Sequence, residues 1–167
     1  MYYLSDFQRD LLARAATDTA IARYTNDVET LALTLWGEGR GEDLTGRVAI
    51  AWTAMNRVGA KGGTVQDRCL QRLQYSTWWP EGGVDNFRAT MDLAQRAIAG
   101  TADDPIYREC KYLASGVLGR WFRDPTKGAT HYVTKALFYS SVRPTWIPRD
   151  AEGVAIGRHV FLGGIAW

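Results

Sequence analysis

The chain has 167 residues, the size of one ordinary domain, and 46% of them are hydrophobic, which is enough for a packed core. Its net charge of +2 is too small to indicate a nucleic-acid partner, and no apolar run approaches the length of a membrane span. Aromatic residues make up 12% of the chain, so they either enlarge the core or supply flat faces that stack on sugars or bases.

Charge distribution and cysteine usage bear on partners and location. Residues 105–167 contain nine Lys or Arg and four Asp or Glu, so this half either suits an acidic polymer or presents a solvated basic face. The first residues, Met1 to Gln8, lack the basic and apolar regions of a signal peptide, and we expect synthesis in the cytoplasm. Cys69 and Cys110 are then expected to be reduced, buried thiols.

Capping signals and helical periodicity predict three helices in the first part of the chain. A capping box at Ser5 starts a helix over Ser5–Ala16, which continues weakly to Tyr24. Asn26 is a second cap signal, for a helix that ends near Gly37. Asp43 caps a third helix, over Leu44–Arg57, which is apolar nearly all round and is therefore expected to be central and buried.

The rest of the chain alternates helices with glycine- and proline-rich loops. The sequence predicts one or two helical turns over Val65–Leu70, a strand or extended loop over Leu73–Trp79, helices over Asn86–Ala99 and Pro105–Leu118, and short β pieces at Thr130–Val133 and Arg158–Leu162. The expected fold is mainly α, a single catalytic domain with a small β element. Residues 1–25 would be a helical extension, and residues 26–167 the core.

One carboxylate continues an apolar helical stripe. Val28, Leu31 and Leu35 lie on one face, and Glu38 is the next position on that face. Burial disfavours the charged form, so we expect a raised pKa, which suits a general acid. The alternative is a solvated carboxylate at a frayed helix end. Glycines 37, 39 and 41 are expected to break the helix and to permit close backbone approach.

Further clusters follow the Glu38 region in a fixed order. Together they resemble the SleB-type cell-wall hydrolases, which include spore cortex-lytic enzymes and phage-borne relatives. The resemblance covers about residues 29–161 and rests on five motifs that are weak singly: Glu38-Gly39-Arg40-Gly41-Glu42, Asn56-Arg57, Gln74-Tyr75-Ser76, Asp124-Pro125-Thr126-Lys127-Gly128-Ala129-Thr130-His131-Tyr132 and Ile156-Gly157-Arg158-His159-Val160-Phe161.

The resemblance implies a lysozyme-like fold and cleavage of peptidoglycan glycan strands. Its spore enzymes are lytic transglycosylases that leave 1,6-anhydro-muramic acid ends, and the family's catalytic glutamate corresponds to Glu38. The sequence departs from the family with Gly39 where Ala is common and Tyr75 where Phe is common. We expect no cofactor or metal, no nucleic-acid partner and a monomer. We also expect a phage or prophage endolysin that reaches the wall in the periplasm by a holin-dependent exit.

The same resemblance suggests substrate-binding residues beside Glu38. Tyr75 and Ser76 match an element beside the cleft, where a hydroxyl would stabilise developing charge or bind an N-acetyl group; the alternative is an edge strand. Of Trp78 and the adjacent Trp79, only one is expected to stack on sugar, because neighbours on a strand face opposite ways. Trp78 is taken as the binding residue.

Two residues of the C-terminal half are expected in the cleft, and others are weighed against plain packing. His131 and Tyr132 would orient the substrate. His159 is interpreted mainly as packing, as is Trp146, for which stacking on sugar remains nearly as plausible.

The remaining polar residues of the glutamate motif have structural and auxiliary interpretations. Glu42 and Asp43 are the nearest candidates for a second carboxylate, but a cap at Asp43 and an ion pair at Glu42 fit better. Arg40 would either clamp a substrate group or pair with Glu42, and the pair is favoured.

Three other functions compete with transglycosylation. A muramidase would use water and a second carboxylate, and only its products distinguish it. A zinc amidase or peptidase needs three protein ligands, yet the chain offers only His131 and His159 besides carboxylates and cysteines, without the usual metal-binding spacing. A non-catalytic wall-binding or virion protein would bind cell walls without clearing them.

Overall fold

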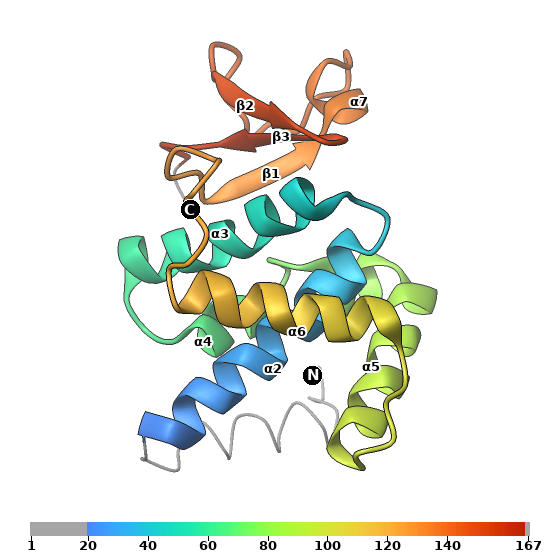
Figure 1. Ribbon diagram of the computed structural model, residues 1–167. Coiled ribbons are helices and arrows are strands. Elements are labelled where there is room, and N and C mark those ends of the chain that lie inside the picture. Colours follow the sequence, from blue (N-terminus) through green and yellow to red (C-terminus); the bar gives the residue numbers. More distant parts are fainter. Residues whose placement is uncertain (1–19, 166–167) are drawn as a thin grey trace.

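The computed structural model describes residues 20–165, with side chains from residue 26 onward. Helices form the body of the molecule, and a small three-stranded sheet stands over one side of it (Figure 1). The helices are α2 (Ala20–Gly39), α3 (Leu44–Lys61), α4 (Val65–Leu70), α5 (Val84–Ile98), α6 (Pro105–Leu118) and α7 (Lys135–Phe138); the 3-10 turns are η1 (Ser76–Trp78) and η2 (Pro80–Gly82); the strands are β1 (His131–Thr134), β2 (Gly153–Ile156) and β3 (His159–Leu162).

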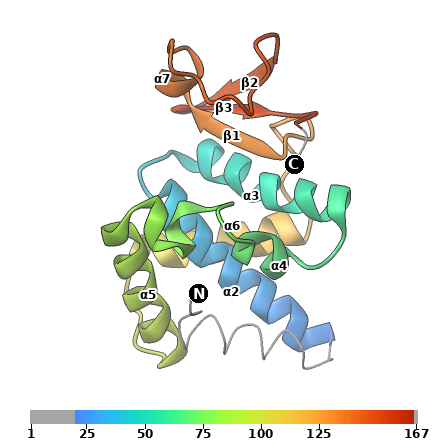
Figure 2. The same ribbon diagram turned by 180° about the vertical axis from the view of Figure 1, so that it is seen from behind.

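Helix α2 is the central element of the body. It packs against α3, α4, α5 and α6, and the views from both sides show it crossing between them (Figures 1 and 2). Its apolar stripe is buried as the sequence predicts, with Leu31 and Leu35 fully enclosed in the main core. Because Glu38 continues that stripe, the helix delivers its carboxylate to the edge of the core.

The predicted cap of α3 is confirmed, and α6 begins at the predicted residue, Pro105. The Asp43 side chain accepts a hydrogen bond from the Gly46 N–H at the start of α3, and Asp104 accepts one from the Tyr107 N–H at the start of α6. Each aspartate satisfies an N–H that has no partner within its helix.

Helix α2, in contrast, starts before its predicted cap. It begins at Ala20, so Asn26 lies within the helix and is buried, and the predicted boundary after residue 25 also falls inside it. The predicted helix over Ser5–Ala16 lies outside the described residues.

The stretch over Leu73–Trp79, predicted as a strand or an extended loop, contains a 3-10 turn instead. Tyr75, Thr77, Trp78 and Trp79 are all buried, so this segment has no alternation between a dry and a wet face. It folds into η1 and η2, with the Trp79 N–H donating to the Ser76 carbonyl. The prediction of a strand was wrong because Tyr75, Trp78 and Trp79 are all buried, whereas a half-buried strand would expose every second side chain.

The sheet has the order β1-β3-β2 with antiparallel pairing throughout. Strands β1 and β3 correspond to predicted pieces, whereas β2 and α7 were not predicted. Tyr132 pairs with Phe161 on the face toward the helical body, while Val160 and Leu162 face a second, smaller core. The molecule is therefore a mainly α domain with a small β element, as the sequence predicts.

Candidate active site

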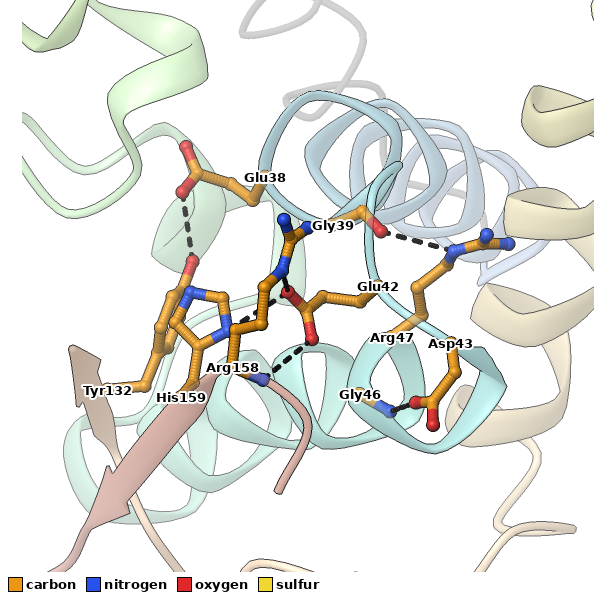
Figure 3. A network of polar contacts seen from close by, with 9 residues as sticks. All are labelled: Glu38, Gly39, Glu42, Asp43, Gly46, Arg47, Tyr132, Arg158 and His159. Atoms are coloured by element: carbon orange, nitrogen blue, oxygen red, sulfur yellow. Dashed lines mark hydrogen bonds and ion pairs between the residues drawn. The ribbon is translucent and has the colours of Figure 1, made fainter. Parts of the chain in front are cut away.

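Glu38 receives three hydrogen bonds from segments distant in the sequence. The Ser76 hydroxyl donates to Oε1 over 2.8 Å, and the Thr77 backbone N–H donates to the same oxygen over 2.7 Å. The Tyr132 hydroxyl donates to Oε2 over 2.9 Å (Figure 3). The side chain is half-buried, so the carboxylate is held from three sides while it still faces the cleft.

The contact with Thr77 depends on a glycine in α2. The helix continues through Gly37 to Gly39, contrary to the expected break, so Gly37 is a helical residue. A Cβ atom at Gly37 would lie 1.8 Å from Thr77 Oγ1, and only glycine lets turn η1 approach this closely. The expected close approach is thus present, and it brings the Thr77 N–H to Glu38.

Glu38 lies in a cavity of about 580 Å³ between the helical body and the sheet. One wall comes from the segment between α4 and α5, and the other comes from β1, the loop after α7 and the end of the chain. A cavity of this size with a few convergent polar groups is typical of ligand sites. Its lining residues are Glu38, Arg57, Leu73, Gln74, Ser76, Trp79, Glu81, Gly82, His131, Tyr132, Trp146 and Ile165.

Tyr132 is a protonated phenol in this site. Burial raises its pKa well above the ordinary value for a phenol, and the nearby Glu38 carboxylate raises it further. The hydroxyl therefore keeps its proton at neutral pH, and its partner in the cavity is Glu38.

His131 lines the cavity as a neutral imidazole. Burial, followed by the positive charge of Arg57, lowers its pKa to about 4. Its Nδ1 lies 2.9 Å from Thr130 Oγ1, and its ring centroid lies 5.5 Å from that of Trp146. Trp146 was interpreted mainly as packing, but it lines the cavity and forms an aromatic surface there together with His131.

Two residues predicted to bind substrate lie beneath the cavity. Tyr75 and Trp78 are fully buried and do not line it. The Tyr75 hydroxyl is 3.0 Å from Thr53 Oγ1, and the Trp78 Nε1–H donates to Thr34 Oγ1 over 2.8 Å. The adjacent Trp79 lines the cavity instead. One tryptophan of the pair therefore faces the cleft, as expected, but it is Trp79 and not the predicted Trp78.

The auxiliary residues of the glutamate motif are arranged differently from the favoured interpretation. Glu42 pairs with Arg158, whose Nε lies 2.7 Å from Oε1, and it does not pair with Arg40. Arg40 instead donates to Asn86 Oδ1 over 2.9 Å and lies over the Trp36 ring. Neither Glu42 nor Arg40 lines the cavity.

Arg57, Glu81 and Leu73 are among the cavity residues that were not singled out in the sequence as site residues. Arg57 is buried, donates to the Thr130 carbonyl over 2.6 Å and lies over the Tyr75 ring. Glu81, in turn η2, is a second carboxylate of the cavity and pairs with Arg72 at 3.3 Å. Leu73 exposes 61% of its surface with a φ of 63°, a conformation that non-glycine residues rarely adopt and that clusters at functional sites.

The described residues contain neither a metal-binding cluster nor a helix that could span a membrane. Between residues 20 and 165, no three His, Cys, Asp or Glu side chains are grouped so that they could hold a metal ion. Within the same range, no helix combines the length and the apolar character that crossing a membrane requires. Cys69 and Cys110 are buried and free, and burial raises the pKa of each thiol to about 12.

Comparison with known proteins identifies the family. No curated protein and no solved structure gave a match, but the family model described as Cell Wall Hydrolase matches residues 41–162, more than half of the chain. The match contains Ser76, His131 and Tyr132 and begins shortly after Glu38. It confirms the resemblance drawn from the motifs: the chain belongs to the SleB-type cell wall hydrolase family, whose substrate is peptidoglycan.

Proposed function

We propose that the protein cleaves the glycan strands of peptidoglycan as a lytic transglycosylase, with Glu38 as general acid and then as general base. The observation that carries this proposal is the three-point support of Glu38 at the cavity. A carboxyl group in that setting has a fixed orientation, which proton transfer to a bound substrate requires.

The hydrogen bonds favour one of the two Glu38 oxygens as the carrier of the proton. A backbone N–H can only donate, so Oε1, which faces Thr77, must act as an acceptor. Oε2 faces the Tyr132 hydroxyl, which can donate to a carboxylate or accept from a carboxylic acid. The transferable proton therefore belongs on Oε2, the oxygen that meets the leaving group.

The reaction then proceeds with Glu38 in two roles. Glu38 Oε2–H gives its proton to the glycosidic oxygen while the bond from that oxygen to C1 of the muramic acid breaks through an oxocarbenium-like state. The C6 hydroxyl of the same sugar forms a new bond to C1 and returns a proton to Glu38. The product is a 1,6-anhydro end, no water is consumed, and the enzyme is regenerated.

Hydrolysis is the second candidate, and Glu81 is the observation that favours it. A muramidase needs a second carboxylate as nucleophile or base. Glu42 is enclosed by Arg158, and Asp43 caps α3, so neither of the carboxylates proposed from the sequence faces the cavity. Glu81 does line it, and a hydrolytic mechanism would use Glu81 with Glu38.

The proposal is tested by digesting purified peptidoglycan with wild type, Glu38→Gln and Glu81→Gln. We expect Glu38→Gln to lower the rate of muropeptide release by at least about 100-fold, since general acid catalysis contributes about 10² to 10⁴. Glu81→Gln should retain more than about a third of the rate, because transglycosylation needs no second carboxylate. Undiminished activity of Glu38→Gln would refute the proposal, and a collapse of Glu81→Gln would support hydrolysis.

A further inference from the structure

Glu42 is an enclosed carboxylate close to the site but outside the cavity. Its side chain is 3% exposed, and both oxygens are occupied: Arg158 Nε lies 2.7 Å from Oε1, and the Arg158 backbone N–H donates to Oε2 over 3.1 Å. Figure 3 shows Glu42 pointing toward Arg158 and His159, whereas Glu38 points toward Tyr132. Glu42 therefore cannot touch the substrate, and any effect on the reaction must pass through other residues.

The space around Glu42 is shaped for this carboxylate. Gly157, just before β3, has a φ of 53°, and a Cβ atom there would lie 2.2 Å from Glu42 Oε2. Burial alone would raise the pKa of Glu42, but the hydrogen bonds from Arg158 and the nearby His159 and Arg158 charges lower it overall. Glu42 is therefore ionised at neutral pH and keeps its hold on the start of β3.

The residue after Arg158 connects this ion pair to the site. His159 Nδ1 lies 3.6 Å from Glu42 Oε1, and the His159 ring stands edge-on to the Tyr132 ring, with centroids 5.1 Å apart and planes at 86°. Phe161 supports the same tyrosine, with ring centroids 5.5 Å apart. The Tyr132 hydroxyl is the group that meets Glu38 Oε2.

We propose that Glu42 is a positioning residue of the catalytic centre. Held by Arg158, it places His159 against Tyr132, and Tyr132 in turn orients the oxygen of Glu38 that carries the proton. The motif thus contains two glutamates, four residues apart, with different tasks. Glu38 transfers the proton, and Glu42 holds the start of β3, from which His159 contacts Tyr132. This inference rests on the proposed role of Glu38.

A double-mutant cycle tests whether Glu42 acts through Tyr132. Glu42→Gln keeps the shape of the side chain and removes its charge, and Tyr132→Phe keeps the ring and removes the hydroxyl. We expect each single variant to lower kcat about tenfold with KM within about twofold, because Glu42 lies outside the cavity and Tyr132→Phe keeps the ring that lines it. The double variant should also lose about tenfold, rather than the hundredfold loss of two independent effects.

The matched control is Glu29→Gln, on α2, the helix that also carries Glu38. Glu29 accepts hydrogen bonds from Tyr107 and Lys111, so it also combines a carboxylate with a tyrosine and a cation, but away from the cavity. We expect its kcat to remain within about twofold of wild type. Three results would each overturn the proposal: additive losses of kcat in the cycle, a rise in KM with kcat unchanged, or an unchanged kcat in Glu42→Gln.

A second variant keeps the test decisive if Glu42→Gln does not fold. Arg158 is 69% exposed, so Arg158→Gln should be tolerated while it releases Glu42 Oε1. We expect a smaller fall in kcat that disappears in the Tyr132→Phe background, and additivity there would contradict the proposal. Glu38→Gln, assayed in the same series, separates the two claims: if it stays active, the role of Glu38 fails, whereas additive cycles with an inactive Glu38→Gln refute only the role of Glu42.

Discussion

At the scale of single residues, Gly37 shows how tightly the site is assembled. Gly37→Ala would place a methyl group 1.8 Å from Thr77 Oγ1, so turn η1 must move away and take the Thr77 N–H from Glu38. We expect a loss of about 1–3 kcal/mol in the free energy of unfolding, as for other overpacked sites, and a fall in kcat of more than about tenfold. Urea unfolding and muropeptide release measure the two effects.

Gly59→Ala is the control for that substitution. Gly59 lies in α3 with no atom within 4 Å of an added Cβ. Alanine there should raise the free energy of unfolding by up to about 1 kcal/mol, because glycine is the poorer helix former, and leave activity unchanged. Equal losses in both variants would mean that the close approach of η1 is unimportant.

His131 gives the protein a predictable response to acid. Its pKa of about 4 in the folded protein lies below the unfolded value of about 6.5, so the unfolded chain binds the proton first. The neutral His131 side chain therefore contributes stability to the folded protein that is complete above about pH 6.5 and is lost as the pH falls toward 4. His131→Gln should therefore lose less unfolding free energy between pH 7 and pH 5 than wild type does.

Urea titrations at the two pH values measure this difference. The pKa of His159 is lowered as well, chiefly by burial, so some slope should remain in the variant. Glu42 and Asp124 have lowered pKa values and titrate below this window, so they do not mask the result. Identical slopes in wild type and His131→Gln would contradict the argument.

At the scale of elements, local signals predicted what local interactions determine. The caps at Asp43 and Asp104 are side-chain bonds to N–H groups three residues away, so their helices begin where the sequence indicates. The segment of η1 and η2 could not be predicted in this way, because its conformation follows from burial of Tyr75 and Trp78 against distant helices. Strand β2 is an edge strand of only four residues, in which the β-branched Val154 and Ile156 alternate with Gly153 and Ala155, and this short signal was missed. The strand forms by pairing with β3.

The loop between α7 and β2 contributes Trp146 to one wall of the cavity, and this contribution can be tested by itself. Trp146 is 44% exposed and stacks near His131 at the cavity. If its ring packs on a sugar, Trp146→Ala should raise KM about 3- to 10-fold with kcat within about twofold, since one aromatic contact contributes about 0.5–1.5 kcal/mol beyond its buried area.

Trp121→Ala is the matched control for the loop. Trp121 is 69% exposed and does not line the cavity, so its removal deletes the same side chain elsewhere on the surface. Its KM should equal that of wild type. Steady-state kinetics on soluble glycan strands decides the matter, and an equal rise in KM in both variants would show that Trp146 has no special place in binding.

At the scale of the whole molecule, the site is built from three segments that the sequence separates widely. Glu38 could be predicted because the stripe of Leu31 and Leu35 points it toward the core, and Ser76 and Tyr132 could be anticipated only through the family resemblance. The pairing of Glu42 with Arg158 and the place of Glu81 depend on how the sheet and the turns pack on the body. No local pattern in the sequence encodes those contacts.

The products of the whole enzyme distinguish intramolecular attack by the sugar from hydrolysis by water. If the C6 hydroxyl of the sugar attacks, no solvent oxygen enters the product; if water attacks, it does. The most direct measurement is digestion of purified peptidoglycan in water enriched with heavy oxygen, followed by mass spectrometry of the released muropeptides. We predict anhydro ends that are about 18 Da lighter than hydrolysed ends and carry no heavy oxygen, and that are absent with Glu38→Gln. Reducing ends that carry the label would contradict transglycosylation and assign Glu38 to a hydrolytic mechanism.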